Sequence, residues 1–459
     1  MTQATAPRLD IGRVLDDGPF TSMQQTVVFM AAMAIVLDGF DGQFIGFAIP
    51  LIIQEWGVTR EAFSPAIATG LIGMAVGMAV AGAIADRIGR RRVLAASVLL
   101  FGSATISIGF SPDLWTIILL RFVAGLGIGG ALPCASTMTA EYAPARARTL
   151  AVSLTIVSFP LGGMLAGIFA GYILPLYGWR GLFIIGGSIP VLYSFVLFAL
   201  LPESPRFLAH HRERWPELVK LLGRMQRSTA AGTQFADAAE TVPTARPKAG
   251  FGALFRDGLA RDTIFVCTAF FMVVLSLYSA FSWLPTMLNA EGLPVALAGQ
   301  GLTAHNLGGV IGALVCAVMI SRFGSRWPMV LSGLAAGLSA LAMMGLDVKS
   351  NAALLIFGFG VHGLFVNAVQ VSLYALCAHV YPTDVRATGT ALGLAVGRGG
   401  GVVSSFIGAW VITSGGANGF LTLLAFGMIA SAVALLFVRR HIPPVATRGG
   451  PAPAPVGSH

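Results

Sequence analysis

The stretch GAIADRIGRRR, residues 82–92, ends in a short basic loop, 86–92, that separates two long apolar stretches. The apolar residues before it cover 62–85, and those after it cover 93–111. Each is long enough to cross a bilayer as a helix, which takes about 20 residues. Gly89 allows the chain to turn tightly, and the arginines around it suit a membrane surface. The stretch therefore predicts two spanning helices joined by a short loop.

The composition extends this prediction to the whole chain. Of 459 residues, 56% are hydrophobic and 11% are charged, with a mean hydropathy of +0.80. A soluble globular protein has about 25% charged residues, so soluble, disordered and fibrous classes are excluded. Twelve apolar stretches can be marked, at 24–50, 62–85, 93–111, 115–140, 150–173, 181–201, 262–288, 298–321, 328–345, 352–378, 386–412 and 418–439.

These stretches divide the chain into five parts. The N-terminal segment 1–23 precedes a six-helix bundle over 24–201, and a polar loop over 202–261 separates it from a second six-helix bundle over 262–440. The tail, 441–459, is rich in Pro and Gly and is predicted to be disordered. Only Arg60, Arg180 and Lys349, among 29 Lys and Arg residues, fall in loops on the side opposite the N-terminus. The positive-inside rule then places both termini and the central loop in the cytoplasm.

The second half repeats the first. Ser321-Arg322-x-Gly324-Ser325-Arg326 occupies the position of the 82–92 loop between spans eight and nine. Pro144 and Arg148 after span four correspond to Pro382 and Arg386 after span ten. Parallel repeats of six helices around a central site define the major facilitator architecture. We therefore predict an all-α polytopic membrane protein with 12 transmembrane helices in two pseudo-symmetric six-helix bundles, the major facilitator fold.

Several other functions lack the residues they need. No lysine follows a glycine as in a phosphate-binding GK[ST] loop, and no HExxH motif or nucleophile–base set occurs, so no enzyme and no metal site are predicted. The four cysteines lie in apolar runs without metal spacing. GLGIGG at 125–130 lies within a span, where small residues favour helix packing over nucleotide binding. The basic residues lie in short loops, which argues against nucleic acid.

Charges inside the spans are costly and are therefore candidates for function. Asp38 and Asp41 share a face of span one, Arg121 lies in span four, and Arg398 lies in span eleven. One interpretation is that an anionic substrate binds an arginine and releases an aspartate to take up a proton, which couples the two fluxes. The other is a set of static charge pairs that hold the halves together. The proton is then the coupling ion, and no cofactor is expected.

Other polar and aromatic residues could complete a site. We expect a ring-sized pocket to draw on Phe40, Phe44, Tyr278, Tyr374, His305 and Asn306, although a buried histidine is more often structural. We expect the cytoplasmic loops to act as a gate through Asp86, Arg87, Gly89 and Arg90. Glu141, Arg146, Glu203 and Arg206 could extend this network or serve loop structure alone.

The chain resembles a known family at several of these motifs. Leu37-Asp38-Gly39-Phe40-Asp41 is similar to the first-span signature of the aromatic acid:H+ symporters, a branch of the major facilitator superfamily. The similarity continues through the Asp86 loop, Arg121-Phe122, Gly178-Trp179-Arg180, Pro202-Glu203-Ser204-Pro205-Arg206 and Tyr381-Pro382-Thr383. It implies that Asp38, Asp41, Arg121, Glu141, Arg386 and Arg398 matter for transport, with Arg386 in the gate. Two departures are Ser321, where relatives often carry an acid, and Cys134, where they often carry Asn.

The resemblance implies proton-driven import of benzoate, hydroxybenzoate or protocatechuate into a bacterial cell for catabolism, by a monomer in the inner membrane. Transport of another organic anion, such as muconate, a dicarboxylate or a sugar acid, and drug export remain alternatives. A transporter-like sensor of aromatic acids is a third, although the loops contain no evident output domain.

Overall fold

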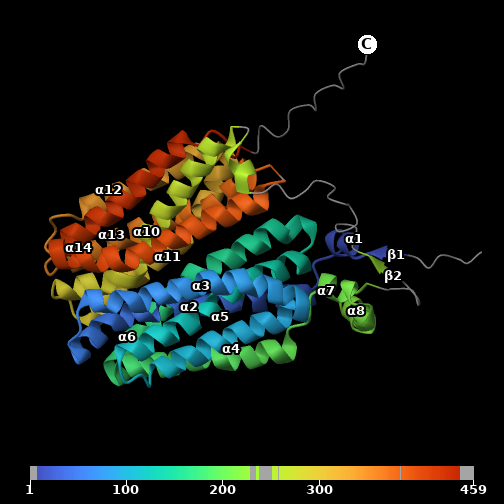
Figure 1. Ribbon diagram of the computed structural model, residues 1–459, viewed down its shortest axis with the longest axis horizontal. Coiled ribbons are helices and arrows are strands. Elements are labelled where there is room, and N and C mark those ends of the chain that lie inside the picture. The colour runs from blue at the N-terminus through green and yellow to red at the C-terminus, as the bar shows by residue number, and fades with distance from the viewer. Residues whose placement is uncertain (1–7, 228–233, 237–250, 257, 383, 445–459) are drawn as a thin grey trace, which may run out of the picture.

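The computed structural model describes residues 8–227, 234–236, 251–256, 258–382 and 384–444 (Figure 1). Long helices run side by side in two bundles. The first bundle contains α2 (Ser22–Trp56), α3 (Arg60–Ile88), α4 (Arg90–Ile108), α5 (Leu114–Tyr142) and α6 (Ala145–Leu200). The second contains α10 (Leu259–Ala290), α11 (Val295–Phe323), α12 (Arg326–Ala342), α13 (Ala352–Val380) and α14 (Arg386–Phe437).

These ten helices form twelve spans within the described residues. Nine of them are long and apolar enough to cross a membrane, and α12 has 17 residues. The two longest each contain two spans, because α6 turns back at Gly178 (φ +64°) and α14 turns back at Gly416 (φ +56°). Both glycines adopt a backbone conformation that L side chains disfavour. The predicted 12-helix fold in two six-helix bundles is confirmed.

Local sequence signals set the helix ends. Thr21 and Gln24 form a capping box at the start of α2, and Gly57 ends that helix in the left-handed conformation. Asp113 caps α5 by accepting a hydrogen bond from the Thr116 amide at 2.8 Å. Within the bundle, Gly125 and Gly129 of the GLGIGG stretch pack against the backbone of α3. The predicted role of these glycines in helix packing is therefore seen directly.

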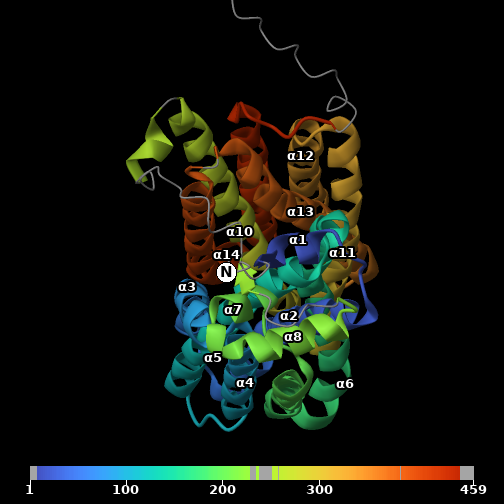
Figure 2. The same ribbon diagram turned by 90° about the vertical axis from the view of Figure 1, so that its right-hand side faces the viewer.

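Short elements collect at one end of the molecule, which we call the terminal face because both ends of the helical region lie there. They are β1 (Arg8–Asp10), α1 (Ile11–Asp16), α7 (Pro205–His210), η1 (Arg212–Arg214), α8 (Trp215–Arg224), β2 (Gln234–Ala236) and η2 (Phe251–Phe255). β1 and β2 pair in parallel, with Leu9 opposite Phe235. Figure 2 views this face and shows α7 and α8 over the first bundle. Part of the predicted central loop and the tail from 445 lie outside the described residues.

Hydrogen bonds join the two bundles in the half of the molecule away from the terminal face. Gln43 of α2 and Asn306 of α11 exchange two hydrogen bonds, at 3.0 and 2.7 Å. Near the end of the spans, Gln54 donates to Asn289 at 3.1 Å, and Thr413 donates to the Glu61 carboxylate at 2.5 Å. Gly46 also lies against the backbone of Phe281, where a side chain would collide. The bundles are therefore in close contact on this side, which we call the opposite face.

Candidate functional site

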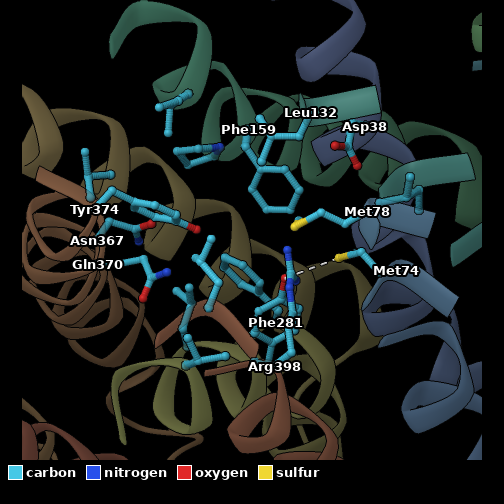
Figure 3. Close-up of a pocket in the computed structure, with 18 of the residues that line it drawn as sticks. Asp38, Met74, Met78, Leu132, Phe159, Phe281, Asn367, Gln370, Tyr374 and Arg398 are labelled. Carbon is cyan, nitrogen blue, oxygen red and sulfur yellow. Dashed lines mark hydrogen bonds between the residues drawn. The ribbon is translucent and has the colours of Figure 1, made fainter. Parts of the chain in front are cut away.

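A cavity lies between the two bundles (Figure 3), and both bundles contribute to its wall. Its polar lining is one acid, one base, two tyrosines and two amides, namely Asp38, Arg398, Tyr278, Tyr374, Asn367 and Gln370. The apolar lining includes Met74, Met78, Leu132, Phe159 and Phe281. An apolar wall with a few convergent polar groups is typical of a small-molecule site.

Asp38 and Arg398 approach this cavity from opposite bundles. Asp38 is 3% exposed, and its buried Oδ1 has no hydrogen-bond partner. Arg398 donates from Nη1 to the Tyr278 hydroxyl at 2.6 Å, and its guanidinium carbon lies 5.8 Å from the centre of that ring. The two charges interact electrostatically, but no ion pair within 4 Å joins them in the part of the chain that the structure describes. The cavity thus holds an acid and a base that are not directly bonded to each other.

Asp41 and Arg121 form a second acid–base combination inside the first bundle. Asp41 is fully buried; its Oδ2 accepts a hydrogen bond from Thr105 at 2.9 Å, and its Oδ1 has no partner. Arg121 is 7% exposed, and its Nε and Nη1 atoms are buried without hydrogen-bond partners. These two charges interact electrostatically, and neither lines the central cavity. The four predicted intramembrane charges are therefore split between two places.

The predicted aromatic residues are also divided. Tyr278 and Tyr374 line the cavity, as expected. Phe40 and Phe44 face the interior of the first bundle, where their ring centroids are 4.6 Å apart and Phe40 packs against Phe169. The structure therefore places these two phenylalanines in the packing of the bundle and not in the wall of the cavity.

His305 and Asn306 also lie outside the wall of the cavity. His305 packs against His362, with ring centroids 5.4 Å apart, and all four ring nitrogens are buried without hydrogen-bond partners. Phe281, which lines the cavity, packs edge-on against His305 with ring centroids 5.9 Å apart. Asn306 is engaged with Gln43 across the bundles. In this conformation neither residue contacts the cavity.

The predicted gate residues form a charge cluster at the terminal face of the first bundle. Arg90 pairs with Glu141 and lies 3.8 Å from Asp86. Glu203 accepts the Arg91 amide at 3.0 Å, and Ser204 donates to Glu141. The turn at Gly89 (φ +103°) lies against the Glu203 carboxylate, which fills the place of a side chain. The structure brings together the loop motif, the end of α5 and the segment after α6.

The other predicted gate residues do not all join this cluster, and one of them lies in the second bundle. Arg87 and Arg146 are exposed, and Arg206 lines a second cavity together with Asp86 and Arg90. In the second bundle, Arg386 donates to the Tyr381 carbonyl at 3.3 Å, and the Ser321 hydroxyl donates within its own helix, to the Val318 carbonyl at 2.7 Å. The departure at Ser321 thus leaves the repeated loop without the acid that the first loop has.

Sequence reasoning missed several residues of the central region. Met74, Met78 and Phe159 line the cavity, but nothing distinguishes them from other apolar residues of a span. Gln43 and Thr105 could have been found, because each is a polar side chain inside a predicted span, close to Asp41 in sequence or in space. The cost of burying an amide within the membrane was the signal available for Gln43.

Two bundles of six spanning helices around a central cavity, with charged groups from both bundles in the middle, define a secondary transporter. The chain belongs to the Major Facilitator Superfamily, whose model matches residues 31–304 and 292–458. The comparisons also confirm the expectation that the chain is not an enzyme, since the family and the relatives are transporters.

The relatives confirm the resemblance drawn from the motifs. The chain is 31% identical to a gallate transporter of Pseudomonas putida over 93% of this chain and 94% of the relative. It is 32% identical to the 4-hydroxybenzoate transporter PcaK of Acinetobacter baylyi over 94% of this chain and 93% of the relative. Among solved structures, the inward open xylose transporter XylE from E. coli matches with a TM-score of 0.71 at 19% identity, covering 91% of this chain and 97% of that one. That likeness shows the fold.

Proposed function

We propose that the protein is a proton-coupled importer of an aromatic carboxylate. The observation that carries this proposal is the placement of Arg398 and Asp38, from opposite bundles, in one cavity lined by aromatic rings. A guanidinium can bind a carboxylate through two parallel hydrogen bonds. Tyr278, Tyr374, Phe159 and Phe281 offer ring faces and edges to an aromatic substrate. The similarity to gallate and 4-hydroxybenzoate transporters supports this substrate class.

Proton coupling follows from competition for the arginine. When a substrate carboxylate binds Arg398, it takes over the positive charge that shares the cavity with Asp38, and a buried carboxylate that loses its counter-charge takes up a proton. Asp41 lies one helical turn further along α2 and is held by Thr105. We propose that Asp41, assisted by Asp38, carries the proton through the transport cycle. No cofactor is required, because the proton gradient supplies the energy.

The membrane orientation is part of the same proposal. The basic loops lie at the terminal face, so that face is cytoplasmic in a bacterial inner membrane and both termini are inside. The bundles are joined at the opposite, outer face, while Arg398 lies 12 residues from the cytoplasmic start of α14. We therefore propose that this arrangement is the inward-facing state of an alternating-access cycle.

The test is uptake by the purified full-length protein in proteoliposomes. A high ratio of lipid to protein is used, so that each vesicle contains a single monomer. Radiolabelled 4-hydroxybenzoate, gallate and benzoate are each offered with and without an imposed inward proton gradient. We expect accumulation of at least one of these acids that depends on the gradient. Equal uptake with and without the gradient would contradict the proposed proton coupling. Uptake of only muconate or a sugar acid would show that the proposed substrate class is wrong. Binding of the acids without any flux would favour a sensor.

A further inference from the structure

A further cavity of about 30 Å³, smaller than the central one, adjoins the central cavity on the side of the opposite face. It is lined by Arg121 and by residues around it, including Gln43, Gly70 and Ser282. Five residues border both cavities, namely Met74, Ile128, Phe159, Tyr278 and Phe281. These five therefore form a partition, with Arg398 and Asp38 on one side and Arg121 on the other.

The partition is built from both bundles. Phe159 belongs to α6 and Phe281 belongs to α10, and their ring centroids are 6.2 Å apart. Tyr278 packs edge-on against Phe281 at 5.6 Å and donates a weak hydrogen bond to the Met74 sulfur at 3.9 Å. Because the contacts join α3 and α6 to α10, a movement of one bundle against the other separates them. The partition can thus open when the transporter changes state.

In this conformation, two buried nitrogen atoms of Arg121 have no hydrogen-bond partner. Its Nε and Nη1 are buried without hydrogen bonds, and although Asp41 acts on it electrostatically, no ion pair within 4 Å joins it to any described residue. A buried charge with unsatisfied hydrogen-bonding atoms is costly and is retained where it is used. A cavity of 30 Å³ holds a water molecule or two, but not an aromatic ring. Gly70 leaves room for the guanidinium, since an added Cβ would lie 3.2 Å from Nη2.

The smaller cavity lies toward the outer face of the molecule. Arg121 lies seven residues from the start of α5, whereas Arg398 lies 12 residues from the opposite, terminal-face end of α14. Gln43 borders the cavity, and its reciprocal hydrogen bonds to Asn306 close the outer side. Separation of the bundles at the opposite face would break this amide pair and widen the space around Arg121. The guanidinium would then face the outside medium.

We infer that Arg121 is the carboxylate-binding half-site of the outward-facing state and that the substrate passes from Arg121 to Arg398 across the Phe159–Phe281 partition. The inference rests on the proposed function, since both half-sites bind the same aromatic acid. Arg121 receives the carboxylate from outside, and Arg398 holds it when the outer side has closed. The two arginines act in sequence, and the freed amides of Gln43 and Asn306 can bind ring hydroxyls in the first state.

The experiment compares the two faces of the membrane. Half-saturation concentrations for labelled 4-hydroxybenzoate are measured in right-side-out and inside-out vesicles, for the native protein, Arg121→Lys and Arg398→Lys. Arg121→Lys should raise the half-saturation concentration on the outer side by about tenfold and change the inner value by less than about twofold, as expected for lost bidentate bonds to a charged group. Arg398→Lys should do the reverse.

A second pair of variants, each a glycine-to-alanine change, controls for misfolding as the cause of a shift. Gly70→Ala places a methyl group against Arg121 and should raise only the outer value. Gly171→Ala, at a position with nothing within 4 Å of the added methyl, should change neither value. Equal shifts on both faces in Arg121→Lys, or no shift on either, would overturn the inference. Failure of the native protein to transport any aromatic acid would instead overturn the proposed function.

Discussion

Gln43 and Asn306, from different bundles, exchange two hydrogen bonds in a fully buried environment. Both donors and both acceptors are side-chain amides, so each residue satisfies the other. Gly163 faces this pair, and a Cβ at that position would collide with both amides. The pair therefore joins the bundles through polar contacts that can be replaced by water when the bundles separate.

The first prediction concerns this amide pair. Gln43→Leu or Asn306→Leu alone removes both hydrogen bonds between the bundles and leaves the other amide unsatisfied at those positions, which costs about 1–3 kcal/mol. The double variant removes both polar groups and should be destabilised less than either single variant. Thermal unfolding in detergent checks this order. Gln54→Leu, which removes an exposed bond to Asn289, is the control and should have little effect. Additive losses in the double variant would contradict the pairing.

A second prediction tests the support of Arg398. Tyr278→Phe removes the hydroxyl that accepts from Nη1 at 2.6 Å while leaving the ring in the partition. The guanidinium loses its orientation, and we expect the KM for 4-hydroxybenzoate uptake to rise about three- to tenfold, the value of about one hydrogen bond. Tyr172→Phe, at a tyrosine that is 72% exposed, should not change KM. An unchanged KM in Tyr278→Phe would mean that Arg398 is positioned by other contacts.

The sequence allowed correct predictions where a departure from the pattern would cost much free energy. Spans follow from bilayer thickness, and the turns at Gly178 and Gly416 fall between predicted spans. Asp38 and Arg398 could be selected because charge within a bilayer is expensive, and both line the cavity. The other residues of the cavity wall could not be predicted, because their position depends on which way each helix is rotated about its axis. Phe40, for example, lies two residues from Asp38 but points into the first bundle. In a helix that is apolar all round, periodicity does not show which face meets the cavity.

A third prediction concerns the charge cluster at the terminal face. The Glu141 side chain is buried, and its carboxylate pairs with Arg90 and accepts from Ser204. Glu141→Gln removes the negative charge, but Arg90 keeps Asp86 at 3.8 Å, so we expect a loss of about 1.5–3 kcal/mol, as for a lost hydrogen bond between charged groups. Thermal unfolding and the yield of folded protein measure this loss. Arg92→Gln, at an exposed position in the first turn of α4, should be close to native. Native stability in Glu141→Gln would show that the pair contributes nothing to the closed packing of this bundle.

The last prediction separates transport from proton coupling. In Asp41→Asn, the amide keeps a hydrogen-bonding group beside Thr105 but cannot gain or lose a proton. We expect this variant to fold, to exchange labelled for unlabelled 4-hydroxybenzoate across the membrane, and to lose accumulation driven by a pH gradient.

Asp38→Asn should differ from Asp41→Asn, because Asp38 shares the cavity with Arg398. Its loss removes the competitor for the arginine, so we expect tighter substrate binding together with lost accumulation. Equilibrium binding of 4-hydroxybenzoate and uptake in proteoliposomes distinguish the two variants. Normal pH-driven uptake by Asp41→Asn would remove that residue from the proton path. Unchanged affinity in Asp38→Asn would show that the substrate does not compete with this aspartate for Arg398.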